Sequence, residues 1–111
     1  MTLPAAVAIS EGKRVHINAT GQWALSAAAD PSVGVATHAC VAGGPLTVKL
    51  WTAPGSFPVV ANAAIVAGAR LFPTANGNVD DAGTTALNLV AREAATAAND
   101  IIEALPCQVG A

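Results

Sequence analysis

The chain has 111 residues, of which 11% are charged and 53% hydrophobic, and its formal net charge is −2 at pH 7. This length supports one ordinary hydrophobic core, so we expect a single domain. The basic residues are scattered without interleaved aromatic residues, which excludes a nucleic-acid partner because no stripe can neutralise a phosphate backbone. The low charge instead predicts a surface that other protein chains cover.

The first segment in chain order, residues 1–9, is uncharged and largely apolar. It lacks the positive region and the small-residue cleavage site of a signal peptide. We expect an N-terminal arm that either frays or docks as an extra strand on a neighbour's sheet edge, followed by a single β domain over 10–111. Synthesis in a cytoplasm would keep Cys40 and Cys107 as reduced thiols.

Short strands separated by turn residues fill the rest of the chain. Alternation of polar and apolar residues indicates strands over 13–18, with Val15 and Ile17 on one face, and over 46–52. The expected strands are about 5–9, 13–18, 22–26, 33–40, 46–52, 57–60, 69–73, 78–80, 86–95 and 100–106. This spacing predicts an all-β fold, a small single-domain β-barrel or sandwich.

The uncharged run 50–69 has about the length of a membrane-spanning helix. Pro54, Gly55 and Pro58 interrupt it, so we expect a connector within the domain and no membrane partner.

The chain repeats itself, which predicts a domain built from two similar halves. Four residues recur at an offset of 56 positions: Gly12, Arg14, Ala19 and Gly21 correspond to Gly68, Arg70, Ala75 and Gly77. At an offset of 55, residues 35–50 match 90–105, so the pseudo-repeats cover about 10–52 and 66–106.

The repeat also bears on residues 91–105, whose alanine, arginine and glutamate content favours a helix. Their counterpart contains Gly43-Gly44-Pro45, which no helix interior tolerates. We therefore expect Ala97–Asp100 to be a turn between two strands, with a register shift or bulge near Ile102.

Motifs for catalysis are missing from the sequence. The only Gly-Lys pair, Gly12-Lys13, lacks the upstream glycine of a phosphate-binding loop, and no Gly-x-Ser-x-Gly elbow occurs. The carboxylates are typical of solvated turns, so we expect no enzyme activity and no cofactor. They include Asp80, Asp81, Glu93, Asp100 and Glu103.

Two further motifs have simpler interpretations than a ligand or a modification. His38, Cys40 and His16 could approach one another as zinc ligands, but their spacing matches no Cys-x-x-Cys pattern, and we expect no metal. Asn18-Ala-Thr20 spells a glycosylation acceptor, which is more simply a hairpin turn.

Apolar residues with unusual exposure are the candidates for a contact surface. Alternation places Trp51 on the outward face, and Trp23 follows the first hairpin glycine. Tryptophan on an outer face usually anchors a contact, the alternative being that each packs at the rim of the core. The expected interface residues are Thr2, Leu3, Pro4, Val7, Ile9, Trp23, Trp51 and Phe57.

Several short segments resemble the capsid decoration proteins of tailed bacteriophages, also called cement or head-stabilising proteins. These segments are 12–15, 30–36, 46–50, 68–72, 76–77 and 101–106, which together extend over nearly the whole chain. The resemblance implies a β-rich virion protein on the outer face of a phage head, often a homotrimer. Such a protein stabilises the head by bridging major capsid proteins and carries no catalytic residues.

Two other functions are compatible with a small duplicated β fold. A carrier domain of the biotinyl or lipoyl type needs a lysine at an exposed hairpin tip, whereas Lys13 and Lys49 lie in expected strands. A carbohydrate- or receptor-binding module on the virion needs exposed aromatic platforms, and the chain has only two tryptophans, two phenylalanines and no tyrosine.

Overall fold

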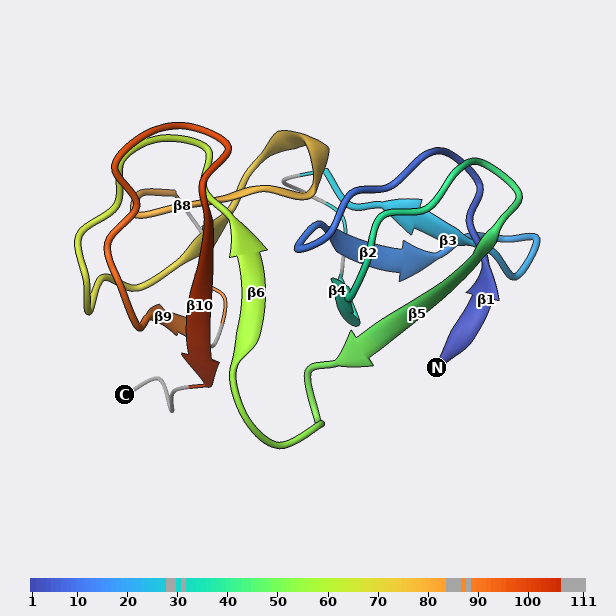
Figure 1. The fold of residues 1–111 in the computed structure, drawn as a ribbon, viewed down its shortest axis with the longest axis horizontal. Helices are drawn as coiled ribbons and strands as arrows, with labels where there is room; N and C mark the ends of the chain where they lie inside the picture. The colour runs from blue at the N-terminus through green and yellow to red at the C-terminus, as the bar shows by residue number, and fades with distance from the viewer. Residues whose placement is uncertain (28–29, 31, 84–86, 88, 107–111) are drawn as a thin grey trace.

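Two halves of the chain contain similar series of strands (Figure 1). The computed structural model describes residues 1–27, 30, 32–83, 87 and 89–106. The first half contains β1 (Thr2–Pro4), β2 (Arg14–Ile17), β3 (Trp23–Leu25), β4 (Gly34–Ala36) and β5 (Pro45–Leu50). The second half contains β6 (Phe57–Val60), β7 (Phe72–Pro73), the 3-10 helix η1 (Ala75–Gly77), β8 (Val79–Asp80), β9 (Leu89–Ala91) and β10 (Ile101–Pro106). The predicted all-β fold class is confirmed.

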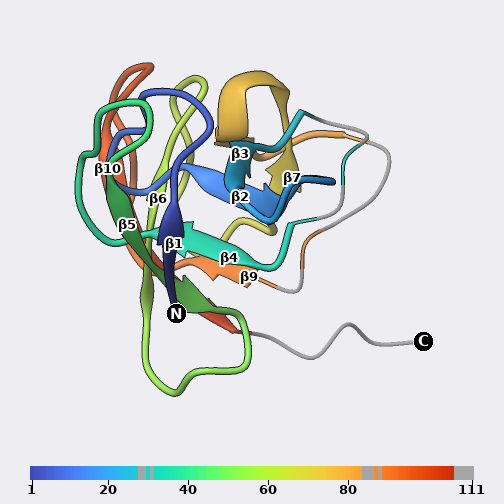
Figure 2. The same ribbon diagram turned by 90° about the vertical axis from the view of Figure 1, so that its right-hand side faces the viewer.

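The described strands form three antiparallel sheets rather than one closed barrel. The first half, which faces the viewer in Figure 2, has one sheet in the order β1-β5-β4-β2-β3. The second half is divided between the sheets β6-β10-β9 and β7-β8. In each half the first strand pairs with the last, since Leu3 lies opposite Leu46 and Val59 lies opposite Ile102.

Backbone contacts outside the strands repeat along the chain, which confirms the duplication. Gly12 and Gly68 have the same φ of +84°, a left-handed conformation that glycine adopts without steric cost. Two isolated bridges recur at equivalent positions: Ile9–Cys40 as Ile65–Ala95, and Ala5–Trp23 as Ala61–Val79.

The last strands of the two halves correspond at an offset of 56, not the 55 read from the sequence. Gly43 and Asn99 occupy equivalent turn positions with φ of 79° and 71°. Leu46 therefore corresponds to Ile102, and both side chains are buried. The expected turn Ala97–Asp100 between two strands is confirmed, and the register shift falls in this loop rather than within β10.

Each half has its own hydrophobic core, because alternate residues of its strands point inward. The expectation of one core from the chain length is therefore wrong. Val35 of the first half belongs to the second core, so the halves also pack against each other. The first core contains Ala5, Ile9, Val15, Trp23, Ala36, Leu46 and Val48. The second contains Phe57, Val59, Ala61, Ile65, Leu71, Val79, Leu89, Ala91, Ala95, Ile102 and Ala104.

The prediction of an N-terminal arm over residues 1–9 is wrong. Residues 2–4 form β1, which pairs with β5 of the same chain, and Ala5 and Ile9 are buried. The strand expected over 5–9 is reduced to isolated bridges at those two residues. The physical reason is the repeat itself, since β1 is the counterpart of β6 and completes its own half.

Candidate interaction surfaces

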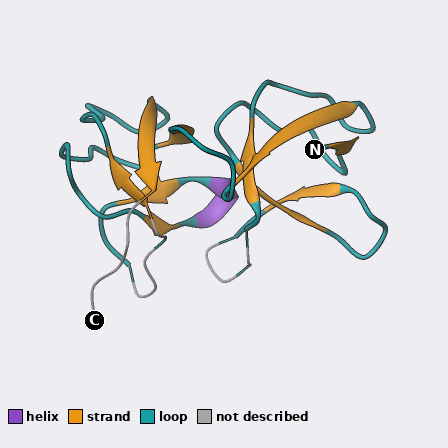
Figure 3. Cartoon of the chain, turned by 90° about the horizontal axis from the view of Figure 1, so that it is seen from below, coloured by secondary structure: helices purple, strands orange, loops and turns teal. Residues whose placement is uncertain are grey.

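The two halves meet at a joint built around Arg14, the first residue of β2. Its side chain has no exposed surface and donates three hydrogen bonds to backbone carbonyls. Nε donates to Asn78 O at 3.1 Å, and Nη2 donates to Thr74 O at 2.7 Å and to Ser26 O at 3.4 Å. Thr74 and Asn78 flank η1, which lies between the halves in Figure 3. A cation of the first half therefore holds a turn of the second half.

Close approach of the backbones completes the joint. Gly77 has a φ of +74°, and a Cβ at this position would lie 2.9 Å from Arg14 O, so only glycine fits. The Gly77 N–H donates to Ser26 O at 2.8 Å. Lys13 Nζ also donates to Asn78 Oδ1, which brings a second cation to the same turn.

Burial weakens the ionised state of these two cations. Desolvation lowers the pKa of Arg14 to about 10, and the nearby Asp30 charge acts in the opposite direction. Desolvation also lowers the pKa of Lys13. Arg14 thus remains charged near neutral pH, and it stays in the joint because carbonyl oxygens accept its hydrogen bonds.

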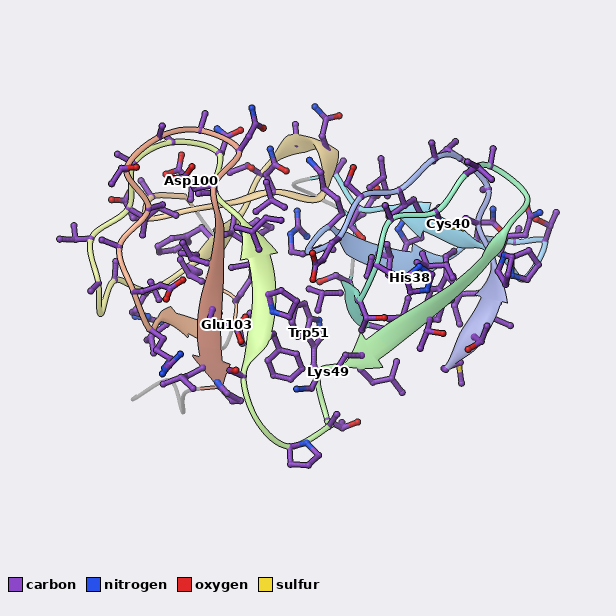
Figure 4. All side chains as sticks on the ribbon, viewed as in Figure 1. His38, Cys40, Lys49, Trp51, Asp100 and Glu103 are labelled. Carbon is purple, nitrogen blue, oxygen red and sulfur yellow. The ribbon has the colours of Figure 1, made fainter. Side chains whose placement is uncertain are left out.

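Side chains also fix the connector between β5 and β6 (Figure 4). The Trp51 and Phe57 rings meet edge to face with centroids 5.1 Å apart, and Lys49 Nζ lies 4.8 Å from the Phe57 ring centre. Lys49 Nζ donates to Ser56 O at 2.6 Å, and Ser56 Oγ donates to Glu103 Oε1 at 2.8 Å. The connector is therefore a structured part of the fold.

The predicted contact residues separate into buried and exposed groups. Ile9, Trp23 and Phe57 are at most 2% exposed, so the prediction that they contact a partner is wrong. Their side chains pack in the two cores instead. Trp23 also forms an isolated backbone bridge with Ala5. Trp51 is half-buried, and its Nε1 donates to Ser32 O at 3.0 Å. The remaining predicted residues reach the surface: Thr2, Pro4 and Val7 are exposed, and Leu3 is half-buried.

A surface without charged side chains lies where two loops of the first half run side by side. We call the exposed residues of 6–10 and 38–44 the uncharged loop face. Val41 is its most exposed large apolar residue, at 72%, and Val7 is 45% exposed. Ile9 and Cys40 exchange backbone hydrogen bonds of 2.9 and 2.8 Å, which hold the two loops together. Between them lies a shallow hollow lined in part by Ala8 and Ala39.

The residues weighed as zinc ligands bind separate partners. His38 Nδ1 lies 2.9 Å from Ala39 O, and His38 Nε2 accepts from the Thr47 N–H at 3.2 Å. Cys40 Sγ donates to the backbone oxygens of Val41 and Pro45, and His16 Nδ1 is hydrogen-bonded to the hydroxyl of Ser26, which follows β3. Among the described residues, no three His, Cys, Asp or Glu side chains gather as a metal site. Cys107 lies outside the described residues.

The glycosylation-like motif shapes the turn between β2 and β3. Asn18 Oδ1 accepts hydrogen bonds from the Thr20 N–H at 3.0 Å, the Thr20 hydroxyl at 2.9 Å and the Gln22 N–H at 3.0 Å. The hairpin-turn interpretation is therefore confirmed. Neither Lys13 nor Lys49 lies at a hairpin tip, where a carrier domain needs its lysine.

Asp100 has a corresponding role in the second half. Its Oδ2 accepts from the Thr96 N–H at 2.9 Å, the Thr96 hydroxyl at 2.9 Å and the Ala97 N–H at 3.2 Å. These hydrogen bonds, the Thr96 N–H first, lower the pKa of Asp100 because they favour its ionised form. The carboxylate thus closes a turn.

Comparison with models of known protein families finds no match, and comparison with curated proteins finds no significant similarity. The resemblance to phage decoration proteins therefore stays a prediction. Over the part of the chain that the structure describes, no helix is long and apolar enough to cross a membrane.

Two features of these surfaces were not predicted from the sequence. Arg14 and Arg70 looked equivalent in the repeat, and only the packing of one half on the other buries the first of them. The exposure of Val41 was also missed, although residues 31–48 around it contain no Asp, Glu, Lys or Arg. That charge-free run is the signal that could have identified Val41.

Proposed function

We propose that this protein is a structural virion protein that binds the outer surface of a bacteriophage capsid and stabilises the head by bridging major capsid proteins. The observation that carries this proposal is the uncharged loop face. Of the charged side chains in the first half, only Glu11 and Asp30 are exposed. A surface of this kind suits permanent contact with another protein better than free solution.

The uncharged loop face is also organised in advance of binding. Backbone hydrogen bonds between Ile9 and Cys40 hold the loops in place, so little loop entropy is lost on contact. Its small residues, such as Ala8, Ala39 and Ala42, lose almost no side-chain entropy when they are covered. Burial of this apolar surface therefore contributes to affinity with little opposing loss of loop or side-chain entropy.

Repetition on a capsid lattice would strengthen weak contacts. A protein that presents several copies of one surface converts later binding events into intramolecular ones, which raises the avidity without new contacts. An assembly of several copies, as the resemblance to decoration proteins implies, would bridge neighbouring capsid proteins in this way.

The two alternative functions find less support in the geometry. A carbohydrate-binding platform needs an open aromatic face, whereas Trp51 packs on Phe57 and uses its Nε1 in a hydrogen bond to Ser32. A carrier domain needs a lysine at a turn tip, whereas Lys49 lies in β5 and its Nζ donates a hydrogen bond to Ser56 O.

The test is attachment of the purified protein to undecorated phage heads of the same source, measured by co-sedimentation over a concentration series. Val41→Asp places a charge on the uncharged loop face, and we expect an affinity loss of about tenfold or more, since a buried unpaired charge is costly. Val66→Asp is the matched control, because Val66 is a loop valine of the other half with 68% exposure. Equal attachment of both variants, or equal loss in both, would show that this face does not bind the capsid.

A further inference from the structure

The joint between the halves is made of two different surfaces. The first half contributes Arg14 and Ser26, which we call the Arg14 socket. The second half contributes residues 74–78, which we call the η1 turn. The Arg14 socket accepts the η1 turn through the hydrogen bonds of the Arg14 guanidinium and of the Gly77 N–H.

Because the halves are repeats, each half carries a version of both surfaces. The counterpart of the Arg14 socket is formed by Arg70 and Ala82 in the second half, and we call it the Arg70 socket. The counterpart of the η1 turn is the β2–β3 turn, residues 18–22, in the first half. One chain therefore contains two sockets and two turns but only one joint.

Exposure distinguishes the occupied surfaces from the vacant ones. Both residues of the Arg14 socket are buried, whereas both residues of the Arg70 socket are exposed. A Cβ on Gly77 would meet Arg14 O at 2.9 Å, whereas a Cβ on Gly21 of the β2–β3 turn would meet nothing within 4 Å.

The two turns also lie at different places along the molecule. In Figure 1 η1 lies between the halves, whereas the β2–β3 turn projects from the right-hand end of the first half. The two halves are thus joined head to tail. In a two-fold symmetric arrangement each half would place its turn in the socket of the other, and both sockets would be filled.

We propose that copies of this chain associate head to tail, with the Arg70 socket of one copy receiving the β2–β3 turn of the next. Arg70 would donate to the backbone oxygens of Asn18 and Gln22, as Arg14 does to those of Thr74 and Asn78 within the chain. The partner is a second copy of this chain, and the inference does not depend on attachment to a capsid. A heterologous contact of this type builds a closed ring or an open filament, depending on the rotation between copies.

The contact between copies is weaker than the joint within the chain. Ala69 stands where Lys13 supplies the second cation of the intramolecular joint. Thr20 stands where Asn76 has a φ of 61°, and a β-branched residue adopts that conformation at a cost. The chain therefore folds on itself first, and copies associate as their concentration rises.

The experiment is sedimentation velocity of the full chain from about 10 μM to about 1 mM, a range that brackets weak to moderate affinities. We expect association of the unaltered chain and an at least tenfold higher dissociation constant for Arg70→Ala. Arg92→Ala is the matched control, since Arg92 is an exposed arginine of the same half. A chain that stays monomeric throughout, or equal association of the two variants, would overturn the proposal.

A photo-crosslinking residue at position 20 tests the geometry of the contact separately. Thr20 is exposed at the tip of the β2–β3 turn. With a mixture of isotopically light and heavy chains, we expect intermolecular adducts between position 20 of one copy and peptides that contain Arg70 or Ala82 of another. Adducts that join position 20 to the β2–β3 turn of a second copy would indicate a two-fold contact and contradict the head-to-tail arrangement.

Discussion

Replacement of Arg14 by alanine should destabilise this protein far more than the same change at Arg70. The two arginines occupy equivalent positions of the repeat, but Arg14 is fully buried in the joint and Arg70 is exposed. Both variants replace arginine by alanine at equivalent positions of the repeat. The difference between their unfolding free energies therefore measures the contribution of the joint.

The magnitude follows from opposing contributions at Arg14. The drop of its pKa to about 10 corresponds to a desolvation cost of about 3 kcal/mol, which alanine would relieve. Against this, three hydrogen bonds from a charged donor are lost, at roughly 1.5–3 kcal/mol each. Truncation of the side chain also leaves a cavity, which costs about 1–3 kcal/mol more. These contributions sum to roughly 2.5–9 kcal/mol of unfolding free energy. Because the hydrogen bond to Ser26 O is long at 3.4 Å, we expect the lower part of that range, about 3–5 kcal/mol.

Equilibrium unfolding in urea, at low micromolar chain concentration, measures this difference. Arg70→Ala should change the unfolding free energy by no more than about 0.5 kcal/mol, as is usual for exposed positions. Similar losses in the two variants, or a loss below about 1 kcal/mol for Arg14→Ala, would refute the inference that Arg14 holds the halves together.

Three further predictions follow from the fold. Deletion of residues 2–9 should abolish the folded β signal in circular dichroism, because β1 and its buried neighbours complete the first half; a folded deletion variant would contradict this. Gly77→Ala should cost at least about 1 kcal/mol more than Gly21→Ala in urea unfolding, since both positions have positive φ but only Gly77 also lacks room for a Cβ. The lowered pKa of Asp100 stabilises the fold above its ordinary pKa of 3.8, and this contribution disappears as the pH falls through the folded-state pKa. In Asp100→Asn, the unfolding free energy should therefore change less with pH below about pH 4 than in the unaltered chain. The same pH dependence in both proteins would show that the turn hydrogen bonds of Asp100 do not cause it.

Much of the fold could be predicted because its signals are local or repeated. The turn at Ala97–Asp100 contradicts helix propensity, yet the glycines and proline at the equivalent place in the first half identified it. The strand over 57–60 was predicted with its observed bounds, since Pro54 and Gly55 place the turn before it, although Pro58 lies within the strand. Strand alternation placed Val15 and Ile17 on one face, and of the two only Val15 lies in the core, since Ile17 is 45% exposed.

The remaining features depend on contacts between distant parts of the chain. Trp23 looked exposed because it follows a turn glycine, but β3 folds back beside Ala5 and buries it. Residues 1–9 looked detached because their partner strand, β5, lies more than 40 positions later in the sequence. Capsid attachment stays a prediction.

The pairing of the first with the last strand in each half affects how the chain folds during synthesis. The first half can close once β5 has emerged from the ribosome, and at that moment Arg14 faces water because η1, which lies well after β5 in the chain, has not yet emerged. At that stage the unoccupied Arg14 socket is accessible to the turns of copies that have already folded. The short tether from β5 to β6 gives the chain's own η1 turn a high effective concentration, so the correct intramolecular closure outruns capture by a neighbour.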